Sequence, residues 1–422
     1  MTATEVTYPR RALSLVEEAL EDTRVVVING LRQSGKSTLA QTVLTGRQDG
    51  ITRYLDDDAT RLAAAADPVG FVRHDGLMII DEVQRVTDLI LAIKHRVDVD
   101  PRPGQYLLTG SAQLLAMRDV PDSLLGRSET VELWPLSQGE IDGQPDGFID
   151  AIFHHGSSLR LPPSADTRRS YVERAIRGGF PEVVRRDDPR RRHRFFESYM
   201  SDLVSRDIRQ LSAIERPADL RRLLNVLAAT MAGLLVAHRI GNDVRLPGST
   251  IKRYLDLLEL VYLIHRIPAW ACNLTTRAVS TPKLLFTDSG VAGHLAGWTL
   301  SRASNPVAPV GPFIENFVLT ELARQLTWAT EPVRLYHFRT KDGIEVDGVL
   351  ERASGEIVSI EVKAAETVRS DDFRGLRYLS ERAGDRFEVG CMLYCGSTSL
   401  SFGNNMIALP ISAIWQTEPP TM

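Results

Sequence analysis

The sequence predicts an α/β protein of three parts: a parallel-sheet core at the N-terminus, a helical middle and a mixed α/β domain at the C-terminus. In the first 110 residues, short apolar runs alternate with helical patterns, as in parallel strands joined by helices. Between residues 220 and 260, apolar residues recur at helical spacing, and after residue 332 strand-like runs dominate. Because 422 residues exceed what one hydrophobic core usually serves, we place three domains at 1–157, 158–300 and 301–422.

The composition is that of a soluble globular protein, with 43% hydrophobic and 25% charged residues. No apolar run approaches the roughly 20 residues that a membrane span needs, and the N-terminus lacks the apolar core of a signal peptide. We therefore expect no membrane partner. Three cysteines form neither an even framework nor a strong zinc pattern, which favours a packing role in a reducing cytoplasm. The net charge of -4 means that any nucleic-acid surface must be local.

Lysine is rare in this chain, since only six of the 50 basic residues are lysine. An arginine-rich chain keeps lysine more readily where a compact ammonium group is needed. The six are Lys36, Lys94, Lys252, Lys283, Lys341 and Lys363. Of these, Lys36 and Lys363 lie in motifs described below.

The first strand and the loop after it carry the strongest motif. Val25–Asn29 is a β-branched apolar run typical of a buried parallel strand, framed by predicted helices at 10–22 and 37–44. The spacing G-x-x-x-x-G-K-[ST] follows, and in such a loop the backbone N–H groups and a helix N-terminus surround a phosphate. The predicted nucleotide contacts are Gly30, Gln33, Ser34, Gly35, Lys36, Ser37 and Thr38. The lysine reaches the outer phosphates and Ser37 holds Mg²⁺, so the expected cofactors are ATP and Mg²⁺.

A second apolar run, Leu77–Glu82, ends in two acids. We assign Asp81 to the magnesium shell and Glu82 to the polarisation of the attacking water, because hydrolysis needs a base but little covalent chemistry. A third buried strand, Tyr106–Leu108, ends in Thr109-Gly110-Ser111. Ser111 or Thr109 is the candidate sensor of the γ-phosphate, and the alternative is a simple strand-to-loop turn.

Arg127 follows Gly126 on a predicted loop. It is a candidate arginine finger toward the nucleotide of a neighbouring subunit, and this predicts a homo-oligomer, such as a ring. The alternative is a surface arginine.

Several of these segments resemble the prokaryotic AAA+-type ATPases of the archaeal-ATPase-like group. They are Gly30–Thr38, Ile79–Gln84, Leu108–Ser111, Leu125–Arg127 and Leu133–Leu136. Two later segments, Gly178–Pro181 and Asp202–Leu211, resemble the C-terminal region that accompanies this ATPase in a large bacterial and archaeal family. The resemblance implies a RecA-like AAA+ P-loop core, a helical and winged-helix middle domain and a restriction-endonuclease-like end.

The middle region is rich in arginine and ends in a helix-turn-helix pattern. Its arginines include Arg185, Arg186, Arg190, Arg191, Arg192 and Arg194. Such helices track a phosphate backbone, or they form a solvated face or an interdomain contact with the interleaved acids. Ser249 is a predicted N-cap for the helix Thr250–Leu260, and a strand at Val261–Ile267 follows. This order predicts a winged helix that contacts nucleic acid, or a lid that couples nucleotide state to movement.

The C-terminal order αβββαβ resembles the restriction-endonuclease-like fold. The three-residue loop Ala353–Gly355 sets a hairpin register that places Asp347 opposite Glu361 and Glu345 opposite Lys363. The predicted buried face carries Val346, Leu350, Val358, Ile360 and Val362. The other face gathers the charged residues.

Two facing carboxylates beside a lysine suit a divalent metal and a water aimed at a phosphate. The resemblance assigns the metal to Asp347 and Glu361 and the lysine role to Lys363, with Glu315 in support. The alternatives are an ion-paired hairpin and a nuclease-like fold that only binds.

Together these features predict a cytoplasmic Mg²⁺-dependent ATPase that acts on nucleic acid, with DNA favoured. Three functions remain open at this point: a DNA-remodelling motor, an ATP-gated nuclease, and a nucleotide-dependent switch that binds a protein partner in defence or toxin control.

Overall fold

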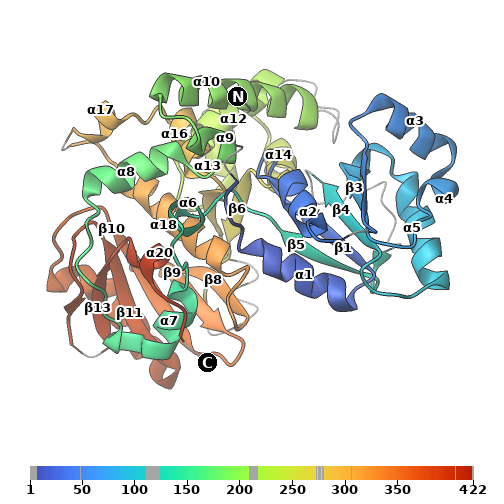
Figure 1. Ribbon diagram of the computed structural model, residues 1–422. Coiled ribbons are helices and arrows are strands. Elements are labelled where there is room, and N and C mark those ends of the chain that lie inside the picture. The colour runs from blue at the N-terminus through green and yellow to red at the C-terminus, as the bar shows by residue number, and fades with distance from the viewer. Residues whose placement is uncertain are drawn as a thin grey trace. The chain divides into compact units, whose positions relative to one another are not determined.

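The computed structural model describes residues 7–47, 49–110, 124–208, 217–271, 273, 277, 280–305, 307–403 and 405–420 (Figure 1). The chain forms two units. Unit 1 comprises Met1–Leu136 with Leu260–Tyr262, and unit 2 comprises Ser137–Glu259 with Leu263–Met422. The predicted domain boundaries at 157/158 and 300/301 both fall inside unit 2, and they stay a prediction.

Unit 1 is built on a five-stranded parallel sheet in the order β2-β3-β4-β1-β5. The strands are β1 (Val25–Asn29), β2 (Ile51–Tyr54), β3 (Met78–Asp81), β4 (Tyr106–Gly110) and β5 (Ser128–Glu132). Strand β1 is buried at every position because it lies between β4 and β5 and carries helices on both faces. The predicted α/β class is confirmed, and the β1 segment was predicted residue for residue.

The helices of unit 1 cover both faces of this sheet. They are α1 (Ala12–Asp22), α2 (Lys36–Leu44), α3 (Asp58–Ala66), α4 (Pro68–Phe71) and α5 (Asp88–Val99), with a 3₁₀ turn at Val83–Arg85. Val26 and Ile28 pack in a cluster with residues of α1 and α2. Val25 and Val27 pack in another cluster with residues of α5. This alternation follows from the two-residue period of a strand.

The helical part of unit 2 ends in a helix-turn-helix and a hairpin. Its helices are α6 (Gln138–Asp142), α7 (Phe148–His155), α8 (Arg168–Arg177), α9 (Pro181–Val184), α10 (Pro189–Asp202), α12 (Pro217–Ala229), α13 (Ala237–Val244), α14 (Gly248–Leu260), α16 (Ser289–Leu295) and α17 (Leu300–Ala303). A π-helical segment, Leu203–Asp207, follows α10. The antiparallel pair β6 (Ile264–Ile267) and β7 (Lys283–Phe286) comes after α14. The winged-helix assignment stays a prediction.

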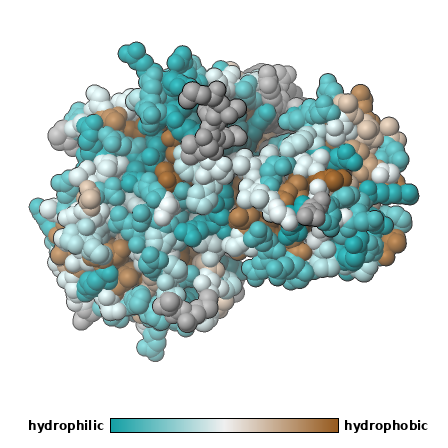
Figure 2. Space-filling model, in the orientation of Figure 1, coloured by the Kyte–Doolittle hydropathy of each residue, from teal (hydrophilic) through white to brown (hydrophobic). Residues whose placement is uncertain are grey.

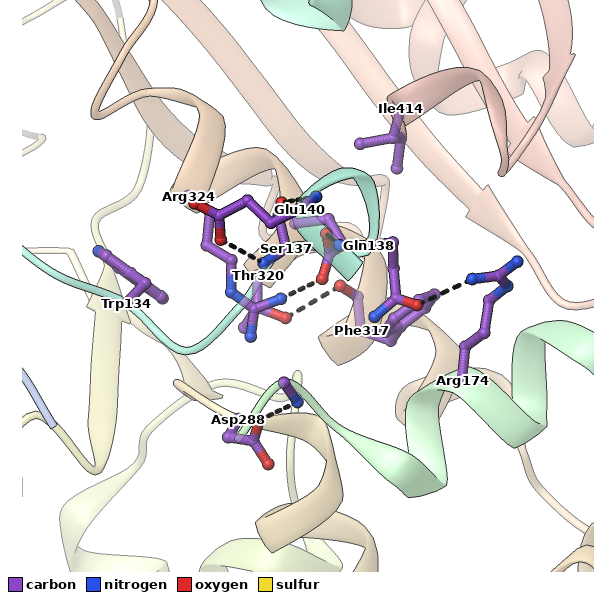
Figure 3. Close-up of polar contacts among 12 residues, drawn as sticks. Trp134, Ser137, Gln138, Glu140, Arg174, Asp288, Phe317, Thr320, Arg324 and Ile414 are labelled. Atoms are coloured by element: carbon purple, nitrogen blue, oxygen red, sulfur yellow. Dashed lines mark hydrogen bonds and ion pairs between the residues drawn. The ribbon is translucent and has the colours of Figure 1, made fainter. Parts of the chain in front are cut away.

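Helix α18 (Gly311–Gln325) is the centre of unit 2, and even its polar residues Thr320, Glu321, Arg324 and Gln325 are buried. Figure 3 shows polar contacts in this region, with Thr320 and Arg324 of the helix labelled. Glu321 pairs with Arg324 and accepts the backbone N–H of Gln138 at 2.9 Å. Such buried hydrogen bonds and ion pairs fix the positions of the groups that form them, so α18 holds the helical part against the C-terminal sheet.

The C-terminal sheet has six strands in the order β12-β13-β11-β10-β9-β8. They are β8 (Val333–Arg339), β9 (Glu345–Arg352), β10 (Ile357–Lys363), β11 (Phe387–Tyr394), β12 (Leu400–Ser401) and β13 (Met406–Pro410). Helices α19 (Arg374–Ala383) and α20 (Ala413–Gln416) follow β10 and β13, and 3₁₀ turns lie at Gly156–Ser158, Ser370–Phe373 and Gly384–Arg386.

The predicted hairpin register is confirmed where the strands pair. Val358 lies opposite Leu350 and Ile360 opposite Gly348, and Gly355 adopts the expected left-handed φ of 103°. The predicted faces need one correction. Between β8 and β9 the register shifts by one residue, so Val346 packs in the same cluster as Val349 instead of sharing a face with Leu350. An extra residue in one strand turns the following side chains to the other face.

Within the described residues, no helix is long and apolar enough to cross a membrane. The face drawn in Figure 2 is mostly hydrophilic, and its hydrophobic areas are small and separate.

Candidate ATPase site and the C-terminal acidic cluster

The loop between β1 and α2 has the backbone that its glycines permit. Gly30 has φ of 153° and Gly35 has φ of 100°, both outside the range that most residues adopt. A Cβ atom on Gly30 would lie 2.2 Å from the carbonyl oxygen of Leu133. Gly35 is the N-cap of α2, so the loop leads directly into a helix N-terminus, which favours an anion.

Lys36 and Ser34 are buried in this loop, and their polar atoms suit a phosphate. Lys36 Nζ donates to the carbonyl oxygens of Gly30 and Leu31, each at 3.0 Å. Ser34 has no exposed surface, and within the described residues its Oγ has no hydrogen-bond partner. Because a buried polar atom is rarely left unpaired, the loop fits a ligand that brings oxygen atoms. It therefore fits the phosphates of ATP.

Asp81 and Ser37 meet at the end of β3. Ser37 Oγ donates to Asp81 Oδ1 at 2.8 Å, and Thr109 Oγ1 donates to the same oxygen at 2.6 Å. A serine hydroxyl beside a carboxylate supplies the oxygen ligands that Mg²⁺ takes in phosphate sites. The two predicted magnesium residues are thus brought together.

Glu82 follows Asp81 in a left-handed conformation with φ of 57°, which is uncommon for a residue with a side chain. Its backbone N–H donates to Thr109 Oγ1 at 3.1 Å, and the side-chain amide of Gln84 donates to its carboxylate. Thr109, one of the two candidate sensors, therefore lies beside both acids. Ser111, the other candidate sensor, lies outside the described residues.

Arg10 is a site residue that the sequence did not reveal. Its guanidinium donates to the carbonyl oxygen of Ser34 at 2.7 Å and to that of Trp134 at 2.6 Å. One side chain therefore fixes the phosphate loop to the segment after β5. No motif contains Arg10, and only the fold reveals its contact with a loop 24 residues later.

Arg127 lies near the opposite end of the strands from the phosphate loop. It precedes β5, whose first residue pairs with the first residue of β1, whereas the loop follows the last residue of β1. Its Nη2 atom lies 3.1 Å from Asp98 Oδ2, and this ion pair lowers the pKa of Asp98. The structure does not bring Arg127 to the nucleotide loop of its own chain.

Comparison with known proteins identifies the domain that contains the phosphate loop. Residues 22–142 match the family described as an AAA domain, and the phosphate loop, Asp81 and Glu82 lie within the match. This part of the chain is an AAA-type P-loop ATPase domain. Residues 168–302 and 310–414 of this ATPase match two domains of unknown function, DUF8612 and DUF4143.

Relatives of the ATPase have been found in bacteria and archaea. An uncharacterized protein of Mycobacterium tuberculosis is 29% identical over 85% of this chain and 74% of its own length. An uncharacterized protein of Methanocaldococcus jannaschii is 22% identical over 85% of this chain and 79% of its own. Among solved structures, the Walker-type ATPase PABY2304 of Pyrococcus abyssi is 17% identical, with a TM-score of 0.44 over 70% of this chain and 97% of its own.

The C-terminal part of the ATPase contains a buried group of three carboxylates and one lysine, which we call the acidic cluster: Glu315, Asp347, Glu361 and Lys283. Lys283 pairs with Glu315, and its Nζ lies 3.2 Å from Asp347 Oδ1. The pKa of Glu315 rises to about 8 and that of Glu361 to about 9, through burial first and then through the negative charge of Asp347. Burial lowers the pKa of Lys283, but Asp347 and Glu315 outweigh it and raise that pKa.

The acidic cluster contains a different lysine from the one that the sequence predicted. Besides burial, the charges of Asp347 and Glu315 raise the pKa of Glu361, and the Lys283 ammonium contacts both of those acids. Lys363, assigned to this site from the sequence, pairs with Asp372 instead. Across the described ranges, no group of three or more acidic, histidine or cysteine side chains has the arrangement of a metal site.

Proposed function

We propose that the ATPase couples ATP hydrolysis to the binding or remodelling of nucleic acid, with DNA as the first substrate to test. The observation that supports this is the helix pair α13 and α14. Three residues, Arg245–Pro247, connect the two helices. A helix, a short turn and a second helix form the element that places a helix in the major groove.

The two faces of α14 differ as this function requires. Ile251, Tyr254, Leu255 and Leu258 are buried. Lys252 and Arg253 are exposed, and neither forms an ion pair within the described part of the chain. Arg239 on α13 and Arg245 in the turn are exposed as well. These cations are available to phosphates without first breaking a salt bridge.

Binding through such cations depends strongly on salt. Each phosphate contact releases condensed counterions, and for duplex DNA the slope of log K against log salt is about -0.9 per contact. Loss of two contacts should therefore reduce the magnitude of that slope by about 1.8. A loss of packing would weaken binding without this change in slope.

The test is fluorescence anisotropy with a labelled DNA duplex at several salt concentrations. The variant Lys252→Ala/Arg253→Ala should weaken binding and reduce the slope. A matched control, Arg334→Ala/Lys341→Ala, removes the same charge from two exposed residues outside the helix pair and should bind as the wild type does. If the unaltered protein binds no nucleic acid at any salt, the proposal fails. It also fails if both double variants are equally impaired.

We also propose that the ATPase acts as a homo-oligomer, such as a ring, in the cytoplasm. A finger role for Arg127 requires a neighbouring subunit, because the residue lies near the opposite end of the strands from its own phosphate loop. Exposed Leu125 beside it supplies apolar surface for such a contact.

The cysteines support the cytoplasm as the compartment. The buried thiols of Cys391 and Cys395 are unpaired, which suits a reducing environment.

The two alternative functions have distinct signatures. An ATP-gated nuclease would cut nucleic acid only with a divalent metal and would need Lys363. A switch that binds a protein partner in defence or toxin control would hydrolyse ATP slowly and would not respond to DNA. Either result would favour that alternative over the proposed coupling to nucleic acid.

A further inference from the structure

We propose that Lys283 is the resident cation of the acidic cluster, so that the C-terminal domain holds no divalent metal there and does not cut nucleic acid by a metal-dependent mechanism. This inference goes beyond the proposed function and does not depend on it. It rests on where the lysine lies, on what its carboxylate partners already bond, and on how its strand is held.

The ammonium group of Lys283 has three contacts inside the acidic cluster. It pairs with the Glu315 carboxylate, and it lies 3.2 Å from Asp347 Oδ1 and 3.4 Å from the backbone oxygen of Asp347. The lysine side chain is only 6% exposed, and those of Glu315 and Asp347 are 16% and 13% exposed. An ammonium has three donors, and all three have an acceptor here.

The remaining oxygen of Asp347 is also engaged. The backbone N–H of Val362 donates to Asp347 Oδ2 at 3.0 Å, so both carboxylate oxygens accept N–H groups. Mg²⁺ requires oxygen ligands at about 2.0–2.1 Å in octahedral geometry. A metal ion at this position would have to displace the ammonium and turn Asp347 away from the backbone of β10.

Lys283 is fixed in place by its strand. Asn316 on α18 holds β7 through two hydrogen bonds. Its side-chain amide accepts from the N–H of Phe286 at 2.8 Å and donates to the carbonyl oxygen of Phe286 at 3.2 Å. Lys283 itself pairs with Ile267 of β6. Because Asn316 is adjacent to Glu315 on α18, the same clamp sets the lysine beside its carboxylate partner. The cation is therefore a built-in part of the fold.

Lys363 is not in a position to replace it. Its ammonium pairs with Asp372 in the 3₁₀ turn before α19, and the Asp372 carboxylate also accepts the N–H of Arg369 at 2.8 Å. The lysine expected to aim a water molecule is thus held by another acid. The positive charge in the acidic cluster comes instead from Lys283, in the hairpin of β6 and β7.

The experiment is thermal unfolding of the full chain without nucleotide, in EDTA and in Mn²⁺, followed by tryptophan fluorescence. Four of the five tryptophans, at 270, 298, 328 and 415, lie in unit 2, so the signal reports mainly on that unit. An Asp81→Asn background removes the metal ligand of the phosphate loop. In this background, Mn²⁺ should not shift the melting temperature.

Removal of the Lys283 ammonium should make the thermal stability of unit 2 depend on a divalent metal. Lys283→Ala leaves buried carboxylates without their partner, so the melting temperature in EDTA should fall on the order of 10 °C, and Mn²⁺ should restore part of the loss. Lys363→Ala, the matched lysine control, should gain no response to Mn²⁺. If Lys283→Ala does not fold, the triple variant Lys283→Met/Glu315→Gln/Asp347→Asn removes the charges together and should fold without a response to Mn²⁺.

Two results would overturn the inference. One is stabilisation by Mn²⁺ in the Asp81→Asn background with Lys283 present, because the cluster would then hold a metal beside the lysine. The other is Mn²⁺-dependent cutting of DNA or RNA by the wild type that is lost in Lys363→Ala. The first result needs no altered lysine, so the inference can be refuted even if no lysine variant folds.

Discussion

Lys36 and Glu82 have separate proposed tasks in the ATPase site, and substitutions should separate them. Lys36 lies in the phosphate loop, whereas Glu82 follows Asp81, the proposed magnesium ligand. We expect Lys36→Ala to abolish ATP binding, because the phosphate charge loses its ammonium partner. Glu82→Gln should keep binding and lower turnover roughly 10²- to 10⁴-fold, because the general base is lost. A fluorescent ATP analogue and a phosphate-release assay measure the two effects. Full hydrolysis by Glu82→Gln would show that another residue is the base.

Arg10 offers a second prediction at the residue scale. Its guanidinium joins the carbonyl oxygens of Ser34 and Trp134. Arg10→Ala removes both charge-assisted hydrogen bonds, so we expect a loss of about 1–3 kcal/mol in unfolding free energy and weaker ATP binding. Arg47→Ala, which removes an exposed arginine of the same unit, is the control for charge. Calorimetry with and without ATP makes the comparison, and equal behaviour of the two variants would contradict a clamp role.

The sequence was most informative where site residues are neighbours in the chain. The phosphate loop and the Asp81-Glu82 pair could be predicted because their spacing encodes the chemistry. Arg10 and Lys283 could not, because each acts on segments 24 or more residues away in the chain. The rarity of lysine was a signal for Lys283, but it gave no partner.

At the scale of single elements, the C-terminal hairpin shows what local sequence determines. A three-residue loop with Gly355 fixed the register of β9 and β10, as predicted. The side-chain faces were predicted less well, since the register shift between β8 and β9 depends on a neighbouring strand. That shift moves Val346 to the cluster of Val349. Pairing across one turn is local information, whereas a bulge is set by the whole sheet.

Gly178, at the end of α8, gives the prediction at this scale. A Cβ atom there would lie 2.4 Å from Asp288 Oδ1, and its φ of 69° and ψ of -164° belong to a region used almost only by glycine. Gly178→Ala should lower unfolding free energy by about 2–4 kcal/mol. Gly384→Ala has a similar backbone, with φ of 58° and ψ of -133°, but nothing within 4 Å. Denaturant melts should show a smaller loss for this control, and equal losses would mean that the contact with Asp288 does not matter.

At the scale of the whole molecule, the position of Arg127 predicts cooperation between subunits. Arg127→Ala should lower hydrolysis by about 10³-fold or more, as loss of an arginine finger does. Lys36→Ala should be inactive through loss of binding. A mixture should recover part of the activity, because intact phosphate loops of one variant meet intact fingers of the other. Hydrolysis across mixing ratios, with sedimentation in ATP, tests this. A strictly monomeric protein whose Arg127→Ala variant hydrolyses normally would refute it.

The proposed function requires that hydrolysis in unit 1 responds to nucleic acid bound by the helix pair in unit 2. The most direct measurement is the ATP hydrolysis rate without nucleic acid and with single-stranded, duplex and branched-junction DNA, each at low and moderate salt. We predict that at least one DNA form raises the rate several-fold at low salt, that moderate salt weakens this stimulation, and that Lys252→Ala/Arg253→Ala loses it. A slow rate that no nucleic acid changes at either salt would contradict the account.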